Sequence, residues 1–285
     1  MEIERELKAG LVVLSLALAT TAVAGPFEDG LTAYDRGDYA TALRIWRPLA
    51  DQGEAKAQSC VGVMYGHGYG VQQDYAEALK WSRKAAAQGD AEGQYSLGLM
   101  YSEGKGVPQD YAEALKWFRK AAEQGHPEAQ TNLGAMYAHG YAVRQNSAEA
   151  LKWYRKAAEP RDCADRWRGF SGCEGDALAQ YNLGSMYKEG RGVPQNYTEA
   201  VKWTLKAAEQ GIALAQANLG GMYANGLGVP QDLVQAHKWF SLAAMNGDQE
   251  SVKWRDKVAE TMTAAQIAEA QKLAREWKPS QWKPR

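Results

Sequence analysis

The 285-residue chain contains few of the residues that build catalytic or metal sites. It has three cysteines and four histidines, and it lacks a C-x-x-C pair, a phosphate-binding P-loop and a strand-borne G-x-G-x-x-G motif. Basic and acidic residues nearly cancel, with 33 Lys and Arg against 34 Asp and Glu, so no excess of positive charge favours nucleic acid. We therefore expect no cofactor, no metal and no nucleic acid partner.

Long apolar runs are also missing, except at the N-terminus. The uncharged segment 9–24 is shorter than the roughly 20 apolar residues that cross a bilayer, and it ends in Ala22-Val23-Ala24 before Gly25. This pattern predicts a signal peptide over residues 1–24 and a periplasmic or secreted chain with no membrane span. Three glutamates outnumber two basic residues in the first eight positions, whereas export signals prefer a basic start. A downstream translation start and an uncleaved N-terminal helix are alternatives.

Five tryptophans mark an internal repeat. They lie 36, 36, 50 and 36 residues apart, and removing 14 residues from the third interval restores one period: Trp81, Trp117, Trp153, Trp203 and Trp239. This period over residues 55–248 predicts a solenoid of five units. The units are 55–90, 91–126, 127–176 with an insertion at 160–173, 177–212 and 213–248.

Each unit divides into two helices. The first half reads like ALAQYNLGSMYKEG (177–190) and the second like YTEAVKWTLKAAEQG (197–211), both with apolar residues at helical spacing. A glycine-rich loop that contains Pro194 in this unit separates the halves and forbids a continuous helix. The closing glycines suit a left-handed residue after a helix: Gly89, Gly125, Gly211 and Gly247. Each unit is therefore predicted to be an antiparallel helical hairpin.

The two ends depart from this pattern, as the ends of a solenoid must. Residues 25–54 form a shorter hairpin without the glycine-rich loop, and we expect it to cap the N-terminal end. Residues 249–278 are expected to be C-terminal capping helices, with Thr263 and Gln266 forming a capping box. Residues 279–285 are expected to be a flexible tail.

The shared pattern A-x-A-Q-x-x-L-G-x-M-Y-x-x-G-x-G-V resembles the Sel1-like repeat, a relative of the tetratricopeptide repeat. The resemblance implies an all-α fold, a right-handed α-solenoid with a concave groove. It also implies an adaptor that gathers protein partners, and exported bacterial members are often linked to host contact or envelope assembly. We expect a non-catalytic, monomeric protein that binds a protein or peptide ligand.

The copies differ at five positions of the first helix, the second, fifth, ninth, twelfth and thirteenth, and we predict that these line the groove. Asparagine recurs at the sixth position, where a side-chain amide can bond the backbone of an extended peptide. The alternatives are that the amides bond the neighbouring helix pair and that the variable positions are simply solvated. The predicted groove residues are Asn132, Asn182, Asn218, Tyr95, Tyr181, Glu92 and Lys188.

The insertion 160–173 is predicted to be a second contact. Its cysteines, Cys163 and Cys173, are predicted to form a disulfide in an exported chain, which leaves Cys60 as a packing residue. Tryptophan and arginine often anchor interfaces, and the predicted contact residues are Trp167, Arg166, Arg168 and Phe170. The alternative is a tolerated insertion whose aromatic residues fold back on the solenoid.

An enzyme is the main functional alternative, because some cysteine-rich relatives are associated with β-lactam hydrolysis. The sequence S-M-Y-K, from Ser185 to Lys188, fits the S-x-x-K motif of that chemistry, but no S-D-N or K-T-G partner is present. His67 and His139 occupy the same position in units a whole hairpin apart, too far to share a metal. An envelope-modifying hydrolase and a regulatory partner of a membrane protein are kept as alternatives.

Overall fold

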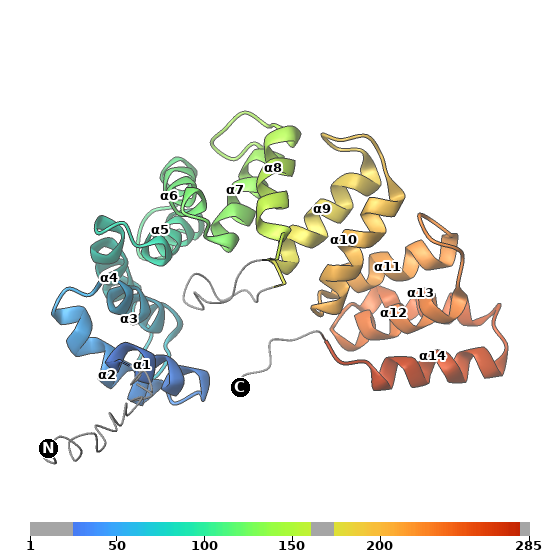
Figure 1. The fold of residues 1–285 in the computed structure, drawn as a ribbon, viewed down its shortest axis with the longest axis horizontal. Helices are drawn as coiled ribbons and strands as arrows, with labels where there is room; N and C mark the ends of the chain where they lie inside the picture. Colours follow the sequence, from blue (N-terminus) through green and yellow to red (C-terminus); the bar gives the residue numbers. More distant parts are fainter. Residues whose placement is uncertain (1–24, 161–173, 280–285) are drawn as a thin grey trace, which may run out of the picture.

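The computed structural model describes residues 25–160 and 174–279, which form fourteen α-helices and no β-strand. Successive helices pair, and the pairs stack side by side into a curved array (Figure 1). The predicted all-α solenoid is therefore confirmed. The helices are α1 (Pro26–Asp35), α2 (Tyr39–Asp51), α3 (Ala55–His67), α4 (Tyr75–Ala87), α5 (Ala91–Glu103), α6 (Tyr111–Glu123), α7 (Pro127–His139), α8 (Ser147–Ala158), α9 (Ala177–Glu189), α10 (Tyr197–Glu209), α11 (Ala213–Asn225), α12 (Leu233–Met245), α13 (Gln249–Ala259) and α14 (Ala264–Glu276).

Side-chain caps fix where the second helix of each unit begins. The Asp74 carboxylate accepts hydrogen bonds from the backbone N–H groups of Ala76 (2.8 Å) and Glu77 (3.1 Å), which lack partners inside the helix. The corresponding residues of the later units cap in the same way: Asp110, Asn146, Asn196 and Asp232. The first helix of each unit ends at a left-handed glycine, such as Gly68 with φ of 74°.

The loop between the two helices lies against the preceding unit. A Cβ atom on Gly106, whose φ is 72°, would lie only 2.8 Å from the Tyr75 carbonyl oxygen. The third unit has Ala142 at this place, the only described residue other than glycine with a left-handed φ (52°). The four predicted closing glycines are also left-handed, with φ between 86° and 97°, which confirms their role.

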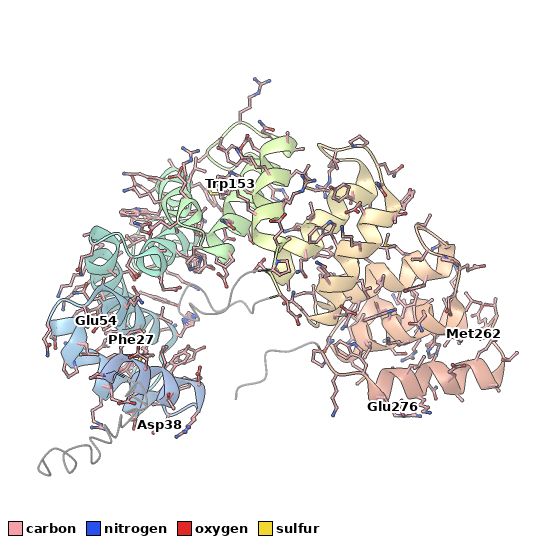
Figure 2. All side chains as sticks on the ribbon, in the orientation of Figure 1. Phe27, Asp38, Glu54, Trp153, Met262 and Glu276 are labelled. Carbon is pink, nitrogen blue, oxygen red and sulfur yellow. The ribbon has the colours of Figure 1, made fainter. Side chains whose placement is uncertain are left out.

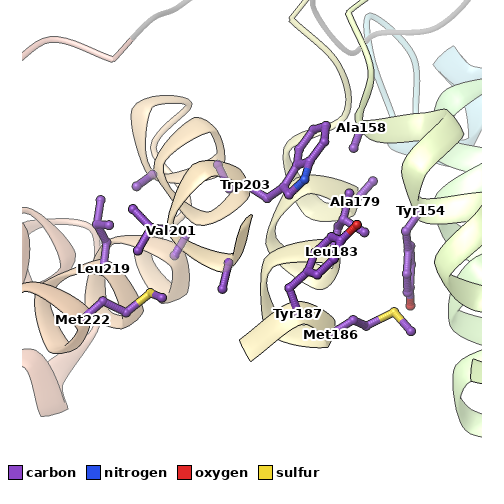
Figure 3. Packing of buried hydrophobic residues seen from close by; sticks show 14 of the residues in the cluster. Tyr154, Ala158, Ala179, Leu183, Met186, Tyr187, Val201, Trp203, Leu219 and Met222 are labelled. Atoms are coloured by element: carbon purple, nitrogen blue, oxygen red, sulfur yellow. The ribbon is translucent and has the colours of Figure 1, made fainter. Parts of the chain in front are cut away.

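The core repeats from unit to unit. Leu183 and Met186 of α9 pack with Trp203 of α10 and with Tyr154 of the preceding unit (Figure 3). The glycine that follows the core leucine lets the two helices of a unit approach closely, since a Cβ on Gly134 would lie 2.8 Å from the Tyr154 ring. Cys60 is buried in the N-terminal part of the core, as predicted for a packing residue.

Glutamine side chains fasten each unit to the next. The Gln88 amide donates to the carbonyl oxygen of Gly53 (3.0 Å) and to the Gln58 side chain (2.9 Å), 35 and 30 residues earlier. Gln124 and Gln210 repeat both bonds one or more units later. Two recurring glutamines that look like ordinary repeat residues in the sequence are therefore a hydrogen-bonded link between hairpins.

Distinct helices close both ends, which Phe27 and Glu276 mark in Figure 2. The Trp46 indole N–H donates to the Phe27 carbonyl oxygen (3.1 Å) and ties α2 to α1. At the other end the predicted capping box of Thr263 and Gln266 is present, and α14 packs on α12. None of the described helices is both long and apolar enough to cross a membrane.

Candidate functional site

The predicted groove residues lie on the first helices of the units, α3, α5, α7, α9 and α11. The thirteenth position is exposed in every unit, and the ninth and twelfth positions are half-buried. The second position is divided: Lys56, Leu178 and Leu214 are exposed, Glu128 is half-buried and Glu92 is buried. Variation between copies therefore does not mean exposure at every predicted position.

In three units the side chain at the fifth position of the first helix contacts the residue just before the first helix of the next unit. We call this region of contact a joint. Ser59 donates a short hydrogen bond to Asp90, and the Thr131 hydroxyl donates to Asp176 (2.8 Å). In the second unit the Tyr95 ring stacks on His126, with centroids 4.5 Å apart. A hydroxyl faces an aspartate in two joints and a tyrosine faces a histidine in the third, so the fifth position varies together with its partner.

Glu92 also belongs to a joint between units. Its Oε2 atom lies 3.0 Å from Nε2 of His126, and the two side chains are only 6% and 2% exposed. His126 Nδ1 lies 3.3 Å from both the Ala129 backbone nitrogen and the Glu128 carboxylate. Burial raises the pKa of the Tyr95 phenol, and the charges of Glu128 and Glu92 add to this. His126 is the N-cap residue of α7, so Glu92 links α5 to the start of the third unit's first helix.

The asparagines at the sixth position have different surroundings. Asn132 lies beside the Tyr95 side chain of the preceding unit, and Asn218 accepts a long hydrogen bond from Lys188 Nζ (3.4 Å). Asn182 makes no hydrogen bond to another described residue. The structure thus brings together two predicted pairs, Tyr95 with Asn132 and Lys188 with Asn218, and leaves Asn182 available on α9. Tyr181, the remaining predicted residue, is half-buried and packs on the core.

Two exposed leucines distinguish the C-terminal part of this face. Leu178 and Leu214 occupy the second position of α9 and α11 and are 53% and 56% exposed. Asn182 lies one helical turn after Leu178, and Asn218 one turn after Leu214, so leucine and asparagine share a face on each helix. The sequence already sets the two leucines apart, because the second position is charged in each of the first three units.

The insertion leaves the backbone hydrogen bond at its junction in place, although Pro160 stands where Gln124 and Gln210 stand in other units. The Asp176 backbone N–H donates to the Ala157 carbonyl oxygen (2.8 Å), as His126 donates to Ala121 (3.1 Å) where there is no insertion. Gly175, with φ of 89°, takes the place of the closing glycine. The predicted disulfide and contact residues lie outside the described residues: Cys163, Cys173, Trp167, Arg166, Arg168 and Phe170.

The described residues include no group of three His, Cys, Asp or Glu side chains able to hold a metal ion. Ser185 and Lys188 lie on α9 as the S-x-x-K motif requires, but the Lys188 ammonium bonds Asn218 rather than the serine. His237 is buried in α12, and burial lowers its pKa, with Arg255 adding to the shift.

The comparisons agree with this architecture. The family model of the Sel1 repeat matches residues 55–90, 91–126, 127–159, 177–212 and 213–248, so the third match ends where the insertion begins. No match is found among curated proteins.

Solved structures show the same fold. A Sel1 repeat protein from Oxalobacter formigenes is 33% identical, with 88% of this chain and all of that chain aligned and a TM-score of 0.70. The protein c5321, a protective antigen of uropathogenic Escherichia coli with an SLR fold, is 31% identical over 88% of this chain and 60% of its own, with a TM-score of 0.56. The immunity protein Pa5087 from Pseudomonas aeruginosa is 21% identical (76% and 82% covered, TM-score 0.50) and supports the fold alone. The chain belongs to the Sel1 repeat family.

Proposed function

We propose that this protein is a non-catalytic adaptor that binds a protein or peptide segment on the first-helix face of its C-terminal units. The observation that carries the proposal is the pair of exposed leucines, Leu178 and Leu214, on adjacent units. Neither side chain belongs to the core, and exposed apolar side chains on neighbouring units can form part of an interaction site. The repeat fold supports an interaction role, since stacked helical units present extended binding surfaces.

The binding surface is formed by α9 and α11, and we call it the leucine surface. It combines the two leucines with the Asn182 amide, which is open to a ligand, and the Asn218 amide, whose bond to Lys188 is long. Leucines would bury apolar side chains of the ligand, and amides would bond its backbone. The predicted peptide-binding asparagines are thus retained for the fourth and fifth units, while Asn132 lies beside the Tyr95 side chain within the protein.

The remaining features of the proposed function concern location. The segment 1–24 supports export to the periplasm or beyond, and a Cys163–Cys173 disulfide fits that compartment. The insertion 160–173 would give the ligand a second contact close to α9. N-terminal sequencing of the protein from a secreting bacterium should begin near Gly25, and both insertion cysteines should resist alkylation until they are reduced.

Site-directed photo-crosslinking tests the adaptor proposal. A photoreactive phenylalanine analogue replaces Leu178 or Leu214 in the full chain, which is expressed and irradiated in the organism that encodes it. Both positions should give the same crosslinked protein. The matched control is Met245, which is 72% exposed on α12 and lies outside the leucine surface, and it should not give that product. Equal crosslinking from all three positions, or none from the two leucine positions, would contradict the proposal.

A further inference from the structure

The two layers of the solenoid carry opposite charge. The second helices α4, α6, α8, α10 and α12 contain twelve Lys and Arg against six Glu. The first helices α3, α5, α7, α9 and α11 contain two lysines against four glutamates. In the N-terminal half of the stack, α4, α6 and α8 lie on the outer side of the arc (Figure 1). Although the chain is nearly neutral, its outer layer is therefore distinctly basic.

Part of this positive charge is neutralised locally. In each of the first four units the lysine that precedes the repeat tryptophan pairs with a glutamate one turn earlier, at 2.8 to 3.6 Å. These lysines, which we call the paired row, are Lys80, Lys116, Lys152 and Lys202. Such pairs leave little net positive charge to attract an acidic partner.

A second row of lysines lacks this neutralisation. Each lies three residues after the tryptophan and holds its ammonium 4.2 to 4.8 Å from the centre of the indole ring. Within the described ranges no carboxylate approaches these ammonium groups within 4.0 Å. This outer row consists of Lys84, Lys120, Lys156 and Lys206. The indole orients each ammonium without cancelling its charge.

We propose that the outer row is a second docking site, which binds an extended acidic protein segment along the second helices of the stack. The first helices α3, α5 and α7 contact one another in turn, whereas neighbouring second helices approach each other less closely, so the outer lysines are spaced by at least a helix diameter, about 10 Å. An extended chain covers that distance in about three residues. The site therefore suits a segment with one carboxylate at every third or fourth residue.

The geometry favours a peptide over other anions. An extended segment can follow the curve of the array (Figure 1), which a flat bilayer does not. B-form DNA carries a charge at about every 1.7 Å, far denser than one lysine per unit. An acidic segment on the second helices and a ligand on the leucine surface could be bound together, because the sites occupy different helices.

Binding of a synthetic peptide tests the site. The probe is an 18-residue peptide of six Gly-Ser-Glu triplets, and the reference peptide carries the same six glutamates in one block. Wild-type protein should bind the spaced peptide more tightly than the block peptide and should lose affinity as salt is added. No detectable binding of the spaced peptide at millimolar concentration would overturn the proposal.

Two variants with equal net charge separate the row from the overall field. Lys84→Gln, Lys120→Gln, Lys156→Gln and Lys206→Gln together should weaken peptide binding at least tenfold. The same four changes in the paired row, at 80, 116, 152 and 202, should weaken it no more than about threefold. Equal losses would overturn the proposal, since they would show a response to net charge alone.

Three further measurements complete the test. Arginine in place of all four outer lysines should retain binding, and loss in that variant as well would count against the site. Vesicles containing anionic phospholipid should not bind through the outer row, and outer-row-dependent vesicle binding without peptide binding would assign the surface to a membrane instead. Leu178→Ser with Leu214→Ser should leave peptide affinity unchanged, which keeps this result separate from the adaptor proposal.

Discussion

The first three units and the last two use the same helix face in different ways. In the first three, variable side chains bond the residue that caps the next first helix, as Glu92 does with His126 and Thr131 with Asp176. In the last two, the second position carries exposed leucines and the Asn182 amide has no partner among the described residues. Several variable side chains therefore stabilise the stack in the first three units, and the exposed second position is available to a ligand in the last two.

This difference changes how variation among internal repeats is interpreted. A side chain can differ between units because it contacts a ligand or because its partner in the next unit differs. Ser59 with Asp90 and Tyr95 with His126 are the second kind. Only positions that vary without a compensating partner, such as Leu178 and Leu214, indicate a binding surface.

The largest expected effect is on the buried joint. Glu92→Ala should lower the free energy of unfolding by about 3 kcal/mol, because the buried Nε2 atom of His126 would lose the Glu92 carboxylate. Leu178→Ala changes the same helix position in an exposed setting and should alter stability by less than about 0.5 kcal/mol. Urea unfolding followed by circular dichroism measures both. Similar losses from the two variants would remove the contrast between the units.

A smaller effect is expected on ligand affinity. Leu214→Ser should weaken binding of the crosslinked partner about tenfold, the equivalent of about 1.4 kcal/mol of lost apolar burial. Titration calorimetry of purified partner measures the change, with Met245→Ser as the control that should bind normally. Reduced binding by the control alone would place the ligand on α12.

The asparagines Asn132 and Asn182 test the same difference between the central and the C-terminal units. Asn132→Ala removes the amide beside the half-buried Tyr95 ring and should lower the melting temperature, while affinity stays constant. Asn182→Ala should instead leave the melting temperature unchanged and weaken binding by up to about tenfold, since one hydrogen bond contributes about 0.5–1.5 kcal/mol. The opposite pattern, with binding lost on substitution of Asn132, would return the ligand to the central units.

The smallest effect concerns pH. Because burial lowers the pKa of His237, the unfolded chain binds a proton more readily than the folded protein. Stability should therefore fall as the pH drops below about 6.5, the ordinary value for histidine. His237→Leu, which restores the residue found in α4, α6 and α8, should flatten this dependence. Thermal unfolding between pH 5 and 8 measures it, and parallel curves for the two proteins would contradict the assignment.

The sequence predicted the parts of the fold that recur. The tryptophan period located the units, and Thr263 with Gln266 identified the start of α14. It did not predict the joints, because each repeat position was compared only with the same position in the other units. Ser59 and Asp90 are 31 residues apart, as are Tyr95 and His126, and Thr131 and Asp176 differ from that spacing by the 14 inserted residues. Covariation at that separation was the missing observation.

The junction around Gly175 and Asp176 has a consequence for protein engineering. The Asp176 to Ala157 hydrogen bond forms in spite of the fourteen inserted residues. The junction therefore accepts an insertion while the helices on either side keep their usual packing. The equivalent glycines Gly89, Gly125 and Gly211 offer the same opening at three other places. Loops with chosen sequences could be inserted there at regular intervals, so that the solenoid would present several epitopes at a fixed spacing.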